Sequence, residues 1–153
     1  MAVDNKTIET ILDKGVDLIK EKYALTKMVP AHVTLLTKKG VPEVVIFQAM
    51  MPHTEIISNM IREVVKKSKD HLAAVMVVFL GWVEMRSTKD PSIPPKRNTA
   101  ITIYTESEDW CKSRNIFVDD GKILEDTGWM EVRTVGGTMT DFGIRDKSKG
   151  MFQ

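Results

Sequence analysis

Three side chains in the first half of the chain have the types that bind metal ions. His32 and His53 offer imidazole nitrogens, and Glu55 offers a carboxylate two residues after the second histidine. Zinc sites use these ligands. Neither H-x-x-x-H nor C-x-x-C spacing occurs in the sequence, so a metal site would require the fold to bring these residues together. The competing interpretation gives these histidines no metal-binding role: His32 lies at a strand edge and His53 at a helix cap.

The same two histidines suggest a small hydrolase as one interpretation. His32-Val33-Thr34 has the H-x-T form of the two-histidine phosphoesterases. Those enzymes need a second H-x-T motif, whereas His53 is followed directly by Thr54. We therefore assign no catalytic residue, and we rank the hydrolase below a non-catalytic protein.

A second group of residues could bind a small molecule or a nucleotide. Trp82 follows an apolar run, Lys96 and Arg97 follow a proline-rich loop at 87–98, and Trp110 lies further along. Aromatic faces and cations suit an anionic, planar ligand. Because the phosphate-binding glycine motifs are missing, the sequence identifies no cofactor.

Composition limits the partners and the setting. The 22 basic and 21 acidic residues leave a net charge of +1, which argues against nonspecific nucleic-acid binding and against attraction to an anionic membrane. The single cysteine, Cys111, cannot form an internal disulfide. The N-terminal sequence also lacks a secretory signal pattern, so we expect a soluble, cytoplasmic protein.

The residues from Leu72 to Val83 form the longest apolar run. Twelve positions are too few for a membrane-spanning helix, which needs about 17–25, and the run is rich in valine. It therefore predicts a strand that is buried on both faces.

The remaining elements follow from periodicity and turn residues. An apolar stripe of period 3.6 predicts an N-terminal amphipathic helix and a second helix after His53. The turn pair Asp120-Gly121 predicts a hairpin. The predicted helices lie in 4–24 and in 51–69, the second with His53 or Thr54 as its cap. The predicted strands are 32–38, 43–49, 72–83, 99–106, 115–119, 122–126 and 129–133.

These elements predict a single α+β domain over residues 1–153. Its two-layer architecture consists of a mainly antiparallel sheet with both helices packed on it. After the N-terminal helix, the chain is expected to form a β-hairpin, a crossover helix, a long central strand and a β-meander. Residues 137–153 show no clear periodicity, and we expect a tail that is flexible or contacts another subunit.

The middle half of the chain resembles small α+β proteins of bacteria and prophages. The shared features are a tryptophan after an apolar strand, a P-S-x-x-P-x-R loop and a strand that ends in glutamate. No activity is implied by this resemblance. The residues that carry it here are Trp82, Pro91, Ser92, Pro95, Arg97 and Glu106.

The favoured functional interpretation is a non-catalytic, homo-oligomeric binding or assembly protein, with a phage link suggested by the resemblance. Exposed methionines and an edge strand of either hairpin would supply the contact between subunits. A small-molecule or nucleotide-binding module is the first alternative. A small hydrolase that uses His32 and His53 is the second.

Overall fold

The computed structural model describes residues 3–47, 54–85, 89–94, 96–132, 142 and 144, with the backbone alone at 54, 82–85 and 97. Two α-helices, one short 3-10 helix and seven strands lie in these ranges. Their bounds are α1 Asn5–Thr26, β1 His32–Thr37, β2 Pro42–Ile46, α2 Thr54–Ser68, η1 Lys69–His71, β3 Leu72–Met85, β4 Lys96–Ser107, β5 Cys111–Asp119, β6 Lys122–Asp126 and β7 Met130–Glu131.

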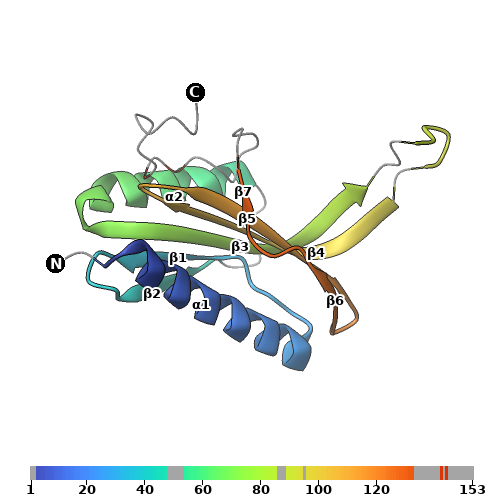
Figure 1. Cartoon of the computed structure of the whole chain (residues 1–153), viewed down its shortest axis with the longest axis horizontal. Helices are drawn as coiled ribbons and strands as arrows, with labels where there is room; N and C mark the ends of the chain where they lie inside the picture. The colour runs from blue at the N-terminus through green and yellow to red at the C-terminus, as the bar shows by residue number, and fades with distance from the viewer. Residues whose placement is uncertain are drawn as a thin grey trace.

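All strands belong to one antiparallel sheet (Figure 1). Its order is β2-β1-β3-β4-β5-β6, and β7 pairs with the other end of β5. The predicted hairpins, the long strand and the meander are confirmed, and so is the α+β class. The turn between β5 and β6 has positive φ angles at Asp120 and Gly121, as its Asp-Gly sequence predicts.

The two helices lie on opposite faces of the sheet (Figure 1). Helix α1 shares a buried cluster with Met76 and Val78 of β3, whereas α2 shares another with Val75 and Val77. Alternation along β3 sends successive side chains to opposite faces. The two clusters explain why this run is apolar at odd and even positions alike.

Helix α1 forms where the sequence predicts it. Asp4 caps its N-terminus, because the carboxylate accepts a hydrogen bond from the Thr7 amide at 2.8 Å. Lys27 ends it with a positive φ of 57°. The face that packs on the sheet is buried and consists of Ile8, Leu12, Val16, Ile19 and Tyr23. Within the described ranges, no helix has both the length and the apolarity needed to cross a membrane.

A group of ion pairs ties α1 to the strands beyond β4. Arg114 donates two hydrogen bonds to Asp126, and Lys20 of α1 lies 2.7 Å from the same carboxylate. The hydrogen bonds from Arg114 are the main reason that the pKa of Asp126 lies far below its usual range.

We expect Asp126→Asn to lower the free energy of unfolding at neutral pH, with a difference from wild type that shrinks below about pH 4. A depressed carboxylate pKa stabilises the fold above the unfolded-state pKa, and this contribution is lost as the group becomes protonated. Urea unfolding at pH 7 and pH 3 would measure it. Asp120→Asn is the control, because the Asp120–Lys27 pair is largely exposed. An equal deficit at both pH values would contradict the prediction.

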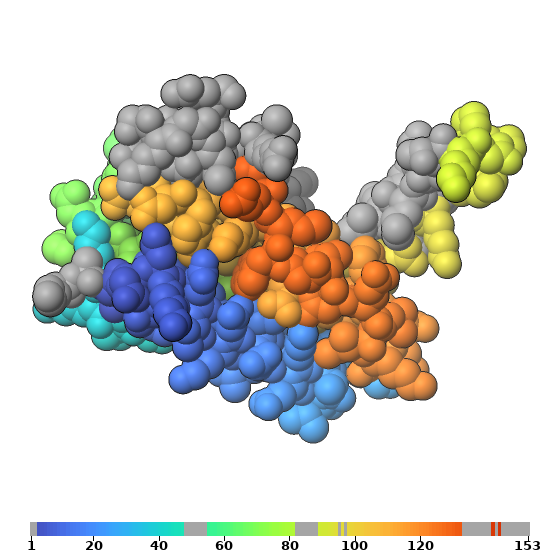
Figure 2. Space-filling view, in the orientation of Figure 1, coloured from blue at the N-terminus to red at the C-terminus, as the bar shows by residue number. Residues whose placement is uncertain are grey.

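The far halves of β3 and β4 leave the body as a two-stranded arm (Figures 1 and 2). Their pairing continues from Trp82 opposite Thr99 to Met85 opposite Lys96. Residues 89–94 lie at the end of the arm and are exposed.

A buried carboxyl group holds residues near the C-terminus to the sheet. Glu106, at 0% exposure, accepts hydrogen bonds from the amides of Phe142 and Ile144, both at 2.8 Å. The Tyr104 hydroxyl donates a further bond at 3.0 Å. Phe142 also packs edge-on against the Tyr104 ring. Residues 142 and 144 thus complete the core on the α2 face; the rest of the predicted tail, 137–153, lies outside the described residues.

Candidate functional site

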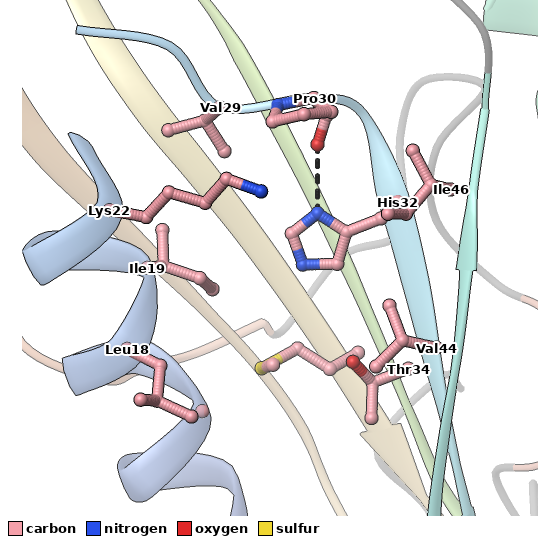
Figure 3. Close-up of a pocket in the computed structure, with 11 residues that line it drawn as sticks. Leu18, Ile19, Lys22, Val29, Pro30, His32, Thr34, Val44 and Ile46 are labelled. Atoms are coloured by element: carbon pink, nitrogen blue, oxygen red, sulfur yellow. Dashed lines mark hydrogen bonds between the residues drawn. The ribbon is translucent and has the colours of Figure 1, made fainter. Parts of the chain in front are cut away.

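A pocket opens between α1 and the β2 edge of the sheet (Figure 3). Its volume is ≈ 200 Å³. Helix α1 and strands β1, β2 and β3 all contribute to the wall. The lining residues are Gly15, Leu18, Ile19, Lys22, Val29, Pro30, His32, Thr34, Val44, Ile46 and Met76. We call this the α1 pocket.

Strand register explains the chemistry of the pocket floor. His32 lies opposite Ile46, and Thr34 lies opposite Val44 and Met76. Directly paired residues in antiparallel strands share a face, and positions i and i+2 do so along one strand. The H-x-T sequence therefore places its imidazole and its hydroxyl side by side, beneath α1.

Gly15 allows helix α1 to approach strand β3 closely at the pocket. A Cβ atom at this position would lie 3.2 Å from Cε of Met76, which is tighter than ordinary packing. A larger residue at this helical position would therefore force the Met76 side chain to move.

The protonation of His32 follows from its surroundings. Its Nδ1 lies 2.8 Å from the Pro30 carbonyl oxygen, which can only accept, so Nδ1 carries the proton. Burial lowers the pKa of His32; the Pro30 hydrogen bond opposes this shift and the Lys22 charge adds to it. The ring is therefore neutral at pH 7, and its Nε2 is a hydrogen-bond acceptor.

Three polar groups meet in this apolar pocket (Figure 3). The pocket wall includes Nε2 of His32, the hydroxyl of Thr34, a residue only 7% exposed, and Nζ of Lys22, an exposed residue; the imidazole lies between the other two groups. Within the part of the chain that the structure describes, none of the three has a hydrogen-bond or ion-pair partner. A few convergent polar groups in an apolar hollow are typical of small-molecule sites.

We expect the half-buried, neutral His32 to make the fold less stable in mild acid. The unfolded chain binds a proton with a pKa near 6.5, and the folded chain binds it less readily, so the free energy of unfolding falls as pH decreases below that value. Thermal melts from pH 7.5 to 5 would show a smaller decrease in His32→Gln. The exposed His71 provides the control, His71→Gln. If the wild type and His32→Gln lose equal stability, the prediction is wrong.

The residues predicted for a second ligand site do not come together as one group. The backbones of Trp82, Lys96 and Arg97 lie in the arm. Trp110 lies beyond the other end of β4, 8% exposed and packed in the α1 core, and a strand of this length spans roughly 35–40 Å. Lys96 instead borders a polar hollow with Phe117, Leu124 and Glu125, among others.

The metal-site residues are only partly placed. His32 faces α1, whereas Glu55 lies in the first turn of α2, the helix on the other face. His53 is outside the described residues, so the metal and hydrolase interpretations stay predictions. Among the residues that are described, no three His, Cys, Asp or Glu side chains come together as metal ligands.

The second notable surface is the outer edge of β2, which is the terminal strand of the sheet among the described residues. Every residue of this strand is exposed, including Val44, Val45 and Ile46 at 57%, 43% and 58%. The Phe47 amide bonds to the Ala31 carbonyl and the Thr37 amide to the Val41 carbonyl. Antiparallel strands alternate bonded and non-bonded pairs, so the backbone groups of Val44 and Ile46 point outward.

Apolar side chains continue this surface onto both helices. On the α1 face, Leu18 is 65% exposed. On the other face, Arg62 of α2 stacks over Phe142, which packs on β4. Arg62 therefore lies on the flank of α2 toward β4. Residues two positions apart lie roughly opposite each other around a helix, so Met60 lies on the other flank, toward the β2 edge. The exposed members of that flank are Ile56, Met60 and Val64.

The opposite edge of the sheet has different chemistry. Strand β6 carries Lys122, Glu125 and Asp126 among its five residues. Charged side chains protect sheet edges from pairing with other strands. Strand β2 has one charged residue, Glu43, and thus lacks this protection.

Sequence reasoning missed Lys22 and recognised only part of the pocket. The H-x-T motif was a real signal, because period 2 puts both side chains on one face of a strand. Nothing in the sequence of α1 distinguishes Lys22 from the other solvent-facing lysines. Comparisons of this chain with protein-family models, curated proteins and solved structures find no match.

Proposed function

We propose that the protein is a non-catalytic binding or assembly protein that works as a homo-oligomer, and that two copies associate through β2. The exposed edge of this strand carries the proposal: Val44, Val45 and Ile46 are consecutive, apolar and accessible. An edge with outward backbone groups and apolar side chains is a template for pairing with another strand.

A second copy fits this edge better than an unrelated strand does. If β2 pairs with its own copy in antiparallel orientation, a two-fold axis relates the two sheets and each chain presents the same surface. Leu18 would then meet apolar residues on one face of the joined sheet, and Met60 would do so on the other. Pairing therefore buries the exposed residues of both helices as well as those of β2.

The proposal places the protein in the cytoplasm. Cys111 is the single cysteine of the chain and is buried, so it forms no internal disulfide, which is ordinary in a reducing compartment.

Native mass spectrometry and light scattering would test the association. We expect a dimer, or a larger assembly built from dimers, for the wild type. Val45→Lys should reduce the mass to the next smaller species, because a lysine at an edge opposes pairing. The matched control is Leu124→Lys on β6, where the wild-type leucine is 64% exposed.

The control should keep the wild-type mass, and both variants should keep the wild-type circular dichroism spectrum. A wild type that stays monomeric at every concentration would overturn the proposal. A Val45→Lys variant with unchanged mass would exclude β2 as the contact.

A small-molecule binder is the second candidate, and the unpartnered polar groups of the α1 pocket favour it.

A further inference from the structure

The α1 pocket combines a largely hydrocarbon wall with a hydrogen-bond acceptor and a hydrogen-bond donor. Nε2 of His32 requires a donor, because Nδ1 already carries the ring proton toward Pro30. Lys22 is a solvent-exposed residue of the pocket wall, and its Nζ offers a hydrogen-bond donor to a bound molecule. Within the described chain neither atom has a partner.

A hydroxyl group can hydrogen-bond to both atoms through one oxygen. Its proton can be donated to Nε2 of His32, and its lone pairs can accept from Nζ of Lys22. A carboxylate would bring no proton for Nε2, and a hydrocarbon would offer a hydrogen bond to neither atom. Thr34, whose hydroxyl can donate or accept, is compatible with such a ligand.

The size of the pocket limits the rest of the ligand. A dry cavity of about 150 Å³ with an apolar lining is known to hold benzene, and the α1 pocket measures ≈ 200 Å³. One aromatic ring, or a chain of a few carbons, therefore fits together with its hydroxyl. Ile19, Val29 and Met76 would surround the apolar body.

We propose that the α1 pocket binds a small apolar alcohol or phenol, whose hydroxyl donates to Nε2 of His32 and accepts from Nζ of Lys22. Leu18, Val44 and Ile46 are exposed and border its entrance. The ligand class goes beyond the proposed self-association and does not depend on it, although the entrance lies beside the β2 edge.

Phenol is the probe, and toluene and benzoate are its matched controls. Titration calorimetry on the full chain should show one phenol per chain. Toluene, which has the ring without the hydroxyl, should bind about tenfold more weakly, because two hydrogen bonds of ordinary strength correspond to roughly that factor. Benzoate should also bind more weakly than phenol, because it can accept from Nζ of Lys22 but has no proton to donate to Nε2 of His32. Equal affinities for phenol and toluene, tighter binding of benzoate, or no binding of phenol would each overturn the proposal.

His32→Leu should remove the preference for phenol over toluene, and His71→Gln should leave it unchanged. A nitrogen-15 spectrum of the histidine rings keeps the proposal testable if His32→Leu does not fold. Phenol should shift the Nε2 resonance of His32 in the wild type, whereas toluene should not. A phenol-induced shift confined to other histidines would place the ligand elsewhere.

Val45→Lys separates the pocket from the dimer. Val45 pairs with Val33, which belongs to the α2 core, so its side chain lies on the sheet face away from the pocket. Phenol should bind this variant within about threefold of the wild-type affinity, whatever its oligomeric state. Loss of binding in this variant, with the fold intact, would contradict a site built within one chain.

Discussion

Glu106→Gln should lower the free energy of unfolding by about 1–3 kcal/mol. The side chain of Glu106 accepts the amide protons of Phe142 and Ile144 on its two oxygens. Glutamine keeps one oxygen and replaces the other with an NH2 donor. One of the two buried amides then faces a donor and loses its partner, and an unsatisfied buried amide costs more than the net value of a hydrogen bond.

Glu106→Ala should have the larger effect, about 3 kcal/mol or more, because it leaves both amides and the Tyr104 hydroxyl without this acceptor. Total stabilities of domains are about 5–15 kcal/mol, so this substitution removes a large fraction. Guanidinium unfolding would measure both variants. Glu125→Gln on β6 is the control at an exposed glutamate and should change stability by less than about 0.5 kcal/mol.

Amide hydrogen exchange distinguishes a local from a global cause. The amides of Phe142 and Ile144 should be protected in the wild type, and at least one should exchange rapidly in Glu106→Gln. Wild-type protection at both positions in the variant would show that the carboxyl group does not hold these residues.

Proline substitutions at two adjacent positions of β2 should have opposite effects. The backbone of Val44 points outward, whereas that of Val45 belongs to the bonded register with Val33. Val44→Pro should prevent pairing with a second copy and keep the fold, since Pro42 already occupies an outward position of the same strand. Val45→Pro should break the β1–β2 ladder and destabilise the fold by about 1–3 kcal/mol.

Mass and melting temperature, measured together, separate these outcomes. We expect Val44→Pro to reduce the native mass to that of the next smaller species. Its Tm should stay close to that of the wild type. A folded Val44→Pro variant that keeps the wild-type mass would rule out backbone pairing through β2. A Val45→Pro variant as stable as the wild type would show that the alternation along β2 is misassigned.

Much of the fold follows from local patterns. Three elements are predicted by their own residues: the apolar stripe predicts α1, the apolar run predicts β3, and the Asp-Gly pair predicts the turn after β5. Helix period, strand burial and turn geometry depend mainly on neighbouring residues. The capping hydrogen bond of Asp4 is local in the same sense, because its partner is the Thr7 amide.

The candidate site was only half predictable. His32 and Thr34 are two residues apart, and strand period alone places them on one face. Their meeting with Lys22 depends on where α1 crosses the sheet, which is a long-range packing result. The same limit applies to the predicted grouping of Trp110 with Lys96, because these two residues lie near opposite ends of β4.

The sequence by itself determined the type and approximate bounds of the helices and strands, because these depend on interactions between residues a few positions apart. Only the tertiary structure decided that the helices cover opposite faces, that β2 lies at an unprotected edge, and that Glu106 meets Phe142 and Ile144. These arrangements depend on strand order and on contacts between residues far apart in the chain, where many pairings satisfy the same local pattern and packing of the whole core selects one.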